Sequence, residues 1–331
     1  MARINIFDLH CDTLDRLALH EAAADLGFSE HDAHIPAERM SSLSNNDAHI
    51  DLERMLGAGY GWCQCFAAFI PDGLGTQRSW NVFETVRDYF RSQLEQHAGL
   101  IEQVHDARDI RRIIGERKCA AIFTVEGGSF IEGDVSRVHE AADAGVKMLT
   151  LTWNGKNAIA SGNQTTDGLT PFGRQVIAAM EERGMVVDVS HLNDCSFWDV
   201  AEATTKPFAA SHSNVRNVCG HPRNLTDEQV RLMVERGGLI GLNFCRDFLR
   251  NDGADPTPDD VLRHVDHFLS LGAEPVLALG SDYDGCDVPS WLDPAEKVGA
   301  LHALFTREFG EDIASAICFE NACAFFERNE A

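Results

Sequence analysis

The sequence predicts an α/β protein, a single (β/α)₈ TIM-type barrel over residues 1–331. Eight short segments that are apolar at nearly every position alternate with helix-forming segments. Strands that are apolar on both faces are typical of a parallel sheet covered by helices, and eight such units close into a barrel. No internal repeat or low-complexity linker divides the chain, and a hydrophobic content of 44% is enough for one large core.

The expected strands are short, and each leads into polar or glycine-rich residues. They cover residues 4–12, 59–70, 119–125, 146–152, 185–190, 208–211, 238–244 and 276–281. In the first half of the chain, helices are expected over residues 79–97, 106–117 and 134–144. Residues 13–54 form a long polar insertion with a loop at residues 41–46, and insertions of this kind often form a lid or a wall of a site.

Helix-start signals mark the later helices. Thr170-Pro171 places a capping Thr before a Pro at the first helical position, and residues 226–229 form a capping box. Asp194 is expected to cap another helix. Two further helices are expected to begin at Thr257-Pro258 and at residues 293–296.

The acidic composition excludes two classes of partner. The chain has 52 acidic and 28 basic residues and a net charge of −24. Nucleic-acid surfaces and anionic membranes both require clustered Lys and Arg. We therefore expect small-molecule substrates and neither a nucleic-acid nor a membrane partner. A homo-oligomer, most simply a dimer, is the expected assembly.

The subcellular location expected from the sequence is the cytoplasm. No apolar leader stretch follows Met1-Ala2-Arg3, no run approaches the length of a membrane span, and residues 325–331 lack the hydrophobic tail of a lipid-anchor signal. We therefore expect the ten cysteines to be reduced thiols. Cys63 and Cys65 alternate within an apolar strand, so they are expected to be small buried hydrophobic side chains rather than metal ligands.

Residues of the types that bind metals follow five of the expected strands. Because parallel strands of a closed barrel end at one rim, these side chains are expected to converge there. They are His10 and Asp12 after the first strand, Glu126 after the third, His191 after the fifth, His212 after the sixth and Asp282 after the eighth. Each alone is more simply explained as a hydrogen-bonded structural residue, but that explanation does not account for their joint occurrence.

Three His and up to three carboxylates exceed the four ligands of one tetrahedral zinc ion. The set fits two zinc ions a few ångströms apart, with one carboxylate as a bridge and one acid left free. Such a pair polarises a carbonyl and supplies a hydroxide at neutral pH. The free acid can then carry a proton to the leaving group.

Six short motifs carry a resemblance to a known family. They are Asp8-Leu9-His10-Cys11-Asp12, Val125-Glu126-Gly127-Gly128, Asp188-Val189-Ser190-His191, Ser211-His212-Ser213, Pro222-Arg223-Asn224 and Gly280-Ser281-Asp282-Tyr283-Asp284-Gly285. In the order and spacing of these motifs the sequence resembles the membrane (renal) dipeptidase family, zinc-dependent members of the amidohydrolase superfamily. The resemblance spans essentially the whole chain and implies a barrel of the metal-dependent hydrolase kind.

The resemblance implies a role for each predicted metal ligand. His10 and Asp12 would hold one zinc ion, His191 and His212 the other, and Glu126 would bridge the two. The cofactor expected is therefore Zn²⁺, two ions per chain.

The resemblance also implies that Asp282 is the catalytic acid/base and that Arg223 grips the substrate carboxylate. Asp284 lies on the same strand face as Asp282, but Asp284-Gly285 is also typical of a turn, which favours Asp282. Arg216 and His221 lie near Arg223 and are alternatives for its role; a solvated loop explains both equally simply.

Residues after the fourth strand are expected to line the substrate pocket. Many sister hydrolases use a carboxylated lysine there, but Lys147 lies at the wrong end of the strand and Lys156 in the loop beyond it, which favours Glu126 as the bridge. Trp153 and Asn154 are expected to bind substrate. Mammalian relatives have a histidine near the developing oxyanion where this chain has Trp153, whose indole N–H can only donate.

These features predict a zinc-dependent dipeptidase in which a metal-bound hydroxide attacks the peptide carbonyl and Asp282 protonates the leaving amine. The resemblance implies that dipeptides with a D-residue at the C-terminal position are also substrates. One alternative is another amide- or lactone-cleaving hydrolase of the same superfamily, which Arg223 and the missing bridging lysine disfavour. The other is a catalytically inactive barrel used as a binding protein, which the complete ligand set disfavours.

Overall fold

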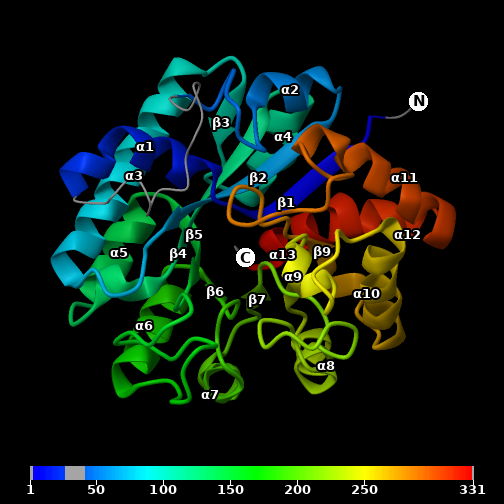
Figure 1. Cartoon of the computed structure of the whole chain (residues 1–331). Coiled ribbons are helices and arrows are strands. Elements are labelled where there is room, and N and C mark those ends of the chain that lie inside the picture. The colour runs from blue at the N-terminus through cyan, green and yellow to red at the C-terminus, as the bar shows by residue number, and fades with distance from the viewer. Residues whose placement is uncertain (1–2, 27–41, 330–331) are drawn as a thin grey trace.

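A closed ring of parallel strands forms the centre of the molecule, and helices surround it (Figure 1). The computed structural model describes residues 3–26 and 42–329. The strands are β1 (Asn5–Cys11), β2 (Gly61–Phe69), β3 (Ile101–Gln103), β4 (Cys119–Glu126), β5 (Val146–Thr150), β6 (Val186–Asp188), β7 (Ala209–Ala210), β8 (Leu239–Leu242) and β9 (Leu277–Leu279). Their order is β2-β1-β9-β8-β7-β6-β5-β4-β3, and pairing of β2 with β4 closes the ring. All eight strands expected from the sequence are present, so the predicted barrel is confirmed.

Helices follow the strands as in a (β/α)₈ barrel. They are α1 (Thr13–Leu26), α2 (Leu52–Gly57), α3 (Thr76–Gln96), α4 (Ala107–Gly115), α5 (Ser136–Asp143), α6 (Pro171–Glu182), α7 (Asp194–Ala203), α8 (Asp227–Glu235), α9 (Arg246–Leu249), α10 (Pro258–Ser270), α11 (Val298–Phe309), α12 (Glu311–Ser315) and α13 (Asn321–Asn329). Among the described helices, none combines the length and the apolar character needed to cross a membrane. In the insertion between β1 and β2, residues 27–41 lie outside the described residues, and with them the first residue of the loop expected at 41–46.

The strand missed by the sequence is β3. Its three residues pair with Cys119–Ala121 at the start of β4, whereas β5 pairs with Phe123–Glu126 further along the same strand. β3 therefore adds to the start of one barrel strand and is no part of the ring. Three residues are too few to show a periodic apolar pattern, which is why the sequence did not reveal it.

Several barrel strands end earlier than expected. β6 ends at Asp188 and β9 at Leu279, whereas strands were expected to continue to residues 190 and 281. The residues after them leave the extended conformation, since His191 and Asp282 have φ angles of 70° and 64°. The polar side chains therefore lie on short turns just above the ring.

Most helix-start predictions are confirmed. Thr170 caps α6 with Pro171 following it, and the Thr226–Gln229 capping box begins α8. The prediction for α7 was wrong by one residue, because the side chain of Asn193 accepts the hydrogen bond from the Ser196 N–H and is the N-cap. Asp194 instead lies in the first turn of α7, where the positive end of the helix dipole stabilises its carboxylate.

The C-terminal helix closes one end of the barrel. Strand side chains that point into the ring, such as Phe7 and Ile122, form one buried cluster with Phe319 and Phe326 near the C-terminus. The Phe7 and Phe326 rings are stacked with centroids 5.5 Å apart. Cys63 and Cys65 belong to this same apolar cluster, as the sequence predicted. The opposite end, where the strands finish, is left for the functional site.

Asp284 holds the loop before α2 against the barrel rim. Its buried carboxylate accepts hydrogen bonds from the Thr13 hydroxyl, from the His49 N–H at 2.9 Å and from the Ile50 N–H at 3.4 Å. Although burial alone would raise it, these contacts with His49 and Thr13 hold the pKa of Asp284 below its ordinary value. These bonds give Asp284 a structural role.

We predict that Asp284→Ala lowers the free energy of unfolding by about 2–4 kcal/mol, because two buried donors and one half-buried donor lose their acceptor. Urea denaturation measures this change. The matched control is Asp266→Ala, which removes an exposed carboxylate from α10. Equal stability of the two variants would contradict the structural role of Asp284.

Candidate metal centre

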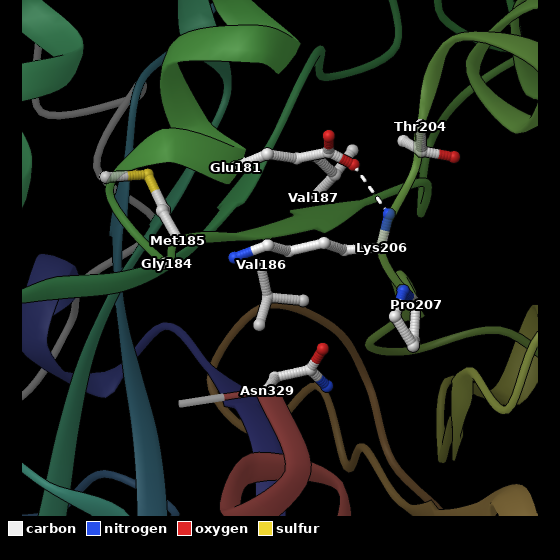
Figure 2. A pocket seen from close by; sticks show the side chains of 9 residues that line it. All are labelled: Glu181, Gly184, Met185, Val186, Val187, Thr204, Lys206, Pro207 and Asn329. Carbon is white, nitrogen blue, oxygen red and sulfur yellow. Dashed lines mark hydrogen bonds between the residues drawn. The ribbon is translucent and has the colours of Figure 1, made fainter. Parts of the chain in front are cut away.

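A large cavity opens above the strand ends and contains the predicted site. Its volume is about 780 Å³, and its wall includes Asp12, Glu126, His191, Arg223 and Asp282. A second cavity, shown in Figure 2, lies beside Val186 and Lys206 at the start of β6, and the Lys206 N–H there donates to Glu181 at 2.9 Å. That cavity measures about 10 Å³, which is room for roughly one water molecule. The cavity at the strand ends has room for a substrate of dipeptide size, and its wall carries the predicted site residues.

The structure brings all six predicted strand-end residues together. The Nε2 atom of His10 lies 3.4 Å from Asp12 Oδ2, 3.3 Å from Glu126 Oε2 and 3.9 Å from Asp282 Oδ1. The Nε2 atoms of His191 and His212 are 3.0 Å apart. These side chains come from five different strands, so the closed ring is what makes them neighbours.

Glu126 lies at the centre of this cluster. Its Oε2 faces His10, whereas its Oε1 lies 2.7 Å from His191 Nε2 and 3.9 Å from His212 Nε2. The two oxygens of one carboxylate therefore face two different groups of ligands. This is the arrangement needed for a carboxylate that bridges two cations.

Hydrogen bonds fix the orientation of both later histidines. His212 Nδ1 lies 2.7 Å from the Ser211 hydroxyl, which itself donates to Asp188 at 2.5 Å. His191 Nδ1 lies 2.9 Å from Asn154 Oδ1. Because an acceptor holds the proton on Nδ1, the lone pair of each ring is on Nε2, which faces the cluster. Such partners commonly orient histidines that ligate metals.

Burial and neighbouring charges set the protonation of these groups. Burial lowers the pKa of His191 and, more strongly, of His212, which favours the neutral form of both rings. Burial alone would lower the pKa of His10, but the carboxylates of Asp12 and Glu126 raise it well above its ordinary value. Burial alone would likewise raise the pKa of Glu126, but His191 and His10 hold it well below. Without a bound cation, His10 therefore carries the positive charge that the carboxylates require.

Asp282 is positioned separately. Asn243 donates to its Oδ2 at 3.1 Å, and the backbone N–H of Asp282 donates to the His10 carbonyl at 3.2 Å. The positive φ angle of Asp282, like that of His191, is uncommon for residues other than glycine. Strained residues of this kind concentrate at functional sites, where the surrounding structure holds them in place.

The residues present fit a metal centre. His10 Nε2 and Asp12 Oδ1 are buried and have no hydrogen-bond partner within the described part of the chain. Two groups, His10–Glu126–His212 and His10–Asp12–Asp282, each place three ligand atoms within 4.8 Å of one another. Gly285 packs so closely on Asp12 and Asp282 that a side chain there would collide with both carboxylates. Imidazole and carboxylate ligands suit a borderline divalent ion.

Comparison with known proteins assigns the family. The family model described as membrane dipeptidase (peptidase family M19) matches residues 1–330. The chain belongs to the membrane dipeptidase family. It is therefore a metallodipeptidase, a hydrolase whose family uses a metal cofactor.

Solved and curated relatives agree with this assignment. A metallopeptidase from Rhodobacter sphaeroides, solved with a phosphinate mimic of the dipeptide L-Ala-D-Ala, is 26% identical; the match covers 99% of this chain and 100% of that one, with a TM-score of 0.88. An uncharacterized protein of Klebsiella pneumoniae is 36% identical over 60% of this chain and 78% of its own length. An uncharacterized dipeptidase of Schizosaccharomyces pombe is 32% identical over 54% of this chain and 45% of its own length.

In this dipeptidase, Arg223 is a buried cation that faces the cavity. It is only 5% exposed, and its guanidinium lies over the Phe248 ring, 5.5 Å from the centroid. One Nη donates to the His212 carbonyl at 3.4 Å, whereas Nε has no partner. Among the side chains described, those of residues 3–19 and 42–329, no carboxylate forms an ion pair with it.

Of the two residues weighed against Arg223, Arg216 is paired with a carboxylate, whereas His221 lies beside Arg223 and accepts its backbone N–H at 3.2 Å. Arg216 forms a two-pronged ion pair with Asp194, at 2.7 and 2.8 Å. His221 lies in the cavity wall, where its ring packs on Phe248 with centroids 4.6 Å apart.

The residues after β5 are also where the sequence placed them. Trp153 lines the cavity and packs edge-on against Phe69, with ring centroids 5.2 Å apart. Asn154 lines it too, but its Oδ1 is engaged by His191 and Asn163. Lys156 pairs with Asp167 at the surface, 2.6 Å away, so it is no bridging ligand.

Sequence reasoning missed Asp15. This carboxylate, in the first turn of α1, is 6% exposed, lines the cavity and leaves its Oδ1 without a hydrogen-bond partner in the described part of the chain. Burial, together with the charges of Asp12 and Glu126, raises its pKa well above the ordinary value. Its spacing from Asp12, one helical turn, is the signal that could have revealed it.

Proposed function

We propose that the protein is a zinc dipeptidase that hydrolyses free dipeptides, including those with a D-residue at the C-terminal position. The observation that carries this proposal is Arg223. A buried guanidinium without a carboxylate partner is costly, and it faces the same cavity as the metal ligands. A substrate carboxylate would supply the missing partner. The D-residue is suggested by the ligand of the Rhodobacter sphaeroides structure, which mimics L-Ala-D-Ala.

Five residues would hold two zinc ions. His10 and Asp12 would bind one, His191 and His212 the other, and Glu126 would bridge them, since its two oxygens face the two groups. When bound, the ions would polarise the scissile carbonyl and lower the pKa of an attacking water. The hydrogen bonds from His191 to Asn154 and from His212 to Ser211 would keep both ligands correctly oriented before binding.

Asp282 would handle the proton. Asn243 holds its Oδ2, which leaves Oδ1 directed toward the cluster, 3.9 Å from His10 Nε2. The carboxylate would accept a proton from the attacking water and release it to the leaving amine nitrogen as the C–N bond breaks. The proton count balances, because one proton moves from water to amine and Asp282 returns to its starting state.

The zinc proposal predicts about two ions per chain in protein purified with zinc, measured by elemental analysis. Glu126→Gln should lower occupancy at both positions, because one carboxylate serves both groups of ligands. Asp282→Asn is the control and should retain both ions. One tightly held ion together with full activity would exclude the two-metal centre.

Asp282→Asn should lower kcat by roughly 10²–10⁴-fold, since the amide keeps the shape of the side chain but cannot accept the proton. Steady-state kinetics with a free dipeptide measures this loss. Asp284→Asn is the matched comparison, because that carboxylate is committed to Thr13 and the loop before α2. If Asp284→Asn shows the large loss and Asp282→Asn does not, the acid/base is Asp284.

Arg223 should restrict the enzyme to substrates with a carboxylate next to the scissile bond. A planar guanidinium binds a carboxylate with two charge-assisted hydrogen bonds. Tripeptides and dipeptide amides should therefore lose roughly 2–5 kcal/mol of transition-state binding, measured as kcat/KM. Arg223→Met should remove most of this discrimination, whereas Arg216→Met, on the same loop, should retain it. Equal turnover of a dipeptide and its amide by the native enzyme would exclude this role.

Asp15 should select for the free amino group at the other end of the dipeptide. Asp15 lies on α1, which follows β1, and Arg223 lies on the loop that follows β7. In the ring β1 is three strands from β7, so the carboxyl group and the guanidinium face the cavity from different sides. An ammonium group beside Asp15 would favour its ionised form. Asp15→Asn should lower kcat/KM for free dipeptides by roughly 10–100-fold and change that for N-acetyl dipeptides little. Asp287→Asn, an exposed carboxylate, is the control. An equal loss with both substrates would show that Asp15 does not contact the ammonium.

A further inference from the structure

Two cysteines meet beside the proposed acid/base. Cys245 lies three residues after the end of β8, and Cys286 lies four residues after Asp282. The Sγ atoms of both cysteines and one carboxylate oxygen of Asp282 all lie within 4.8 Å of one another. All three residues line the cavity of about 780 Å³. The fold alone brings these thiols together, since they are far apart in the sequence.

This cluster has the chemistry of a site for a thiophilic ion. Two sulfurs and a carboxylate oxygen supply three of the four ligands of a tetrahedral site, and the open cavity leaves the fourth position to solvent. In such a site, bonds of about 2.0–2.3 Å place neighbouring ligand atoms roughly 3–4 Å apart. The observed spacing therefore needs only small side-chain rotations to close around an ion.

The surroundings distinguish these thiols from the other buried cysteines. Cys63 and Cys65 are enclosed in the apolar cluster inside the barrel. The Cys286 thiol instead lies within hydrogen-bonding reach of Cys245 and 3.4 Å from the Asp282 carbonyl. The positive charge of Arg223 acts on both Asp282 and Cys245, which would offset the negative charge of an anionic ligand set.

We propose that Cys245, Cys286 and Asp282 form an inhibitory site for a thiophilic divalent ion, separate from the catalytic metal centre. An ion held there would engage the carboxylate that is needed for proton transfer and would partly fill the substrate cavity. Binding does not depend on the function proposed above, whereas inhibition rests on the role of Asp282. The two parts therefore need separate measurements.

Binding is tested by titrating Cd²⁺ into the zinc-loaded enzyme under a phosphine reductant and following the ultraviolet charge-transfer absorption of cadmium–thiolate bonds. The proposed catalytic ligands include no sulfur, so exchange of cadmium for zinc there gives no such band. We expect a saturable band that corresponds to about one ion per chain and disappears in both Cys245→Ser and Cys286→Ser. Cys195→Ser, which removes an exposed thiol on α7, should keep it. Absence of the band, or its survival in either of the first two variants, would overturn the site.

Inhibition is tested by dipeptide hydrolysis, with each variant compared with its own rate before cadmium is added. The half-inhibitory Cd²⁺ concentration should rise at least about tenfold in Cys245→Ser and in Cys286→Ser, and should stay unchanged in Cys195→Ser. Equal cadmium sensitivity in all forms would overturn the inhibitory role. If the enzyme does not hydrolyse dipeptides at all, the proposed function fails, and the absorption titration still decides whether the ion binds.

Discussion

The concentration of buried charge around Glu126 is the constraint on which the rest of the structure depends. Three carboxylates and three imidazoles meet at the rim of the barrel with little access to solvent. Carboxylates at this depth need cations, and among the described residues His10 and the more distant Arg223 supply positive charge. The centre therefore fits a metal cofactor, whose charge would replace that of a protonated His10.

The barrel beneath this centre is stiffened by two further buried carboxylates. Asp8 accepts hydrogen bonds from Gln64 and Ser281 and so links β1 to β2 and to the turn after β9. Asp188 accepts from Thr150 and Ser211 and so links β5, β6 and the turn after β7. Each carboxylate lies just below metal-ligand candidates. The result is a preorganised rim, in which the ligand positions are fixed before any ion or substrate arrives.

The sequence predicted the ring and its six strand-end residues well, because both depend on local signals. An apolar run that leads into His191 or Glu126 is visible without knowledge of the fold, and the closed ring then requires the ends to meet. Features that depend on three-dimensional contact were not predictable. β3 is too short to show periodicity, the commitment of Asp284 to Thr13 spans most of the chain, and the meeting of Cys245 with Cys286 follows only from the pairing of β8 with β9.

The most direct measurement is anomalous diffraction from crystals of zinc-loaded protein with a phosphinate dipeptide analogue. Two zinc peaks should lie on either side of Glu126, one beside His10 and Asp12 and the other beside His191 and His212. The analogue should place its phosphinate between the two peaks and its carboxylate on Arg223. A single peak, or an analogue whose carboxylate lies away from Arg223, would contradict the binuclear dipeptidase centre proposed for this chain.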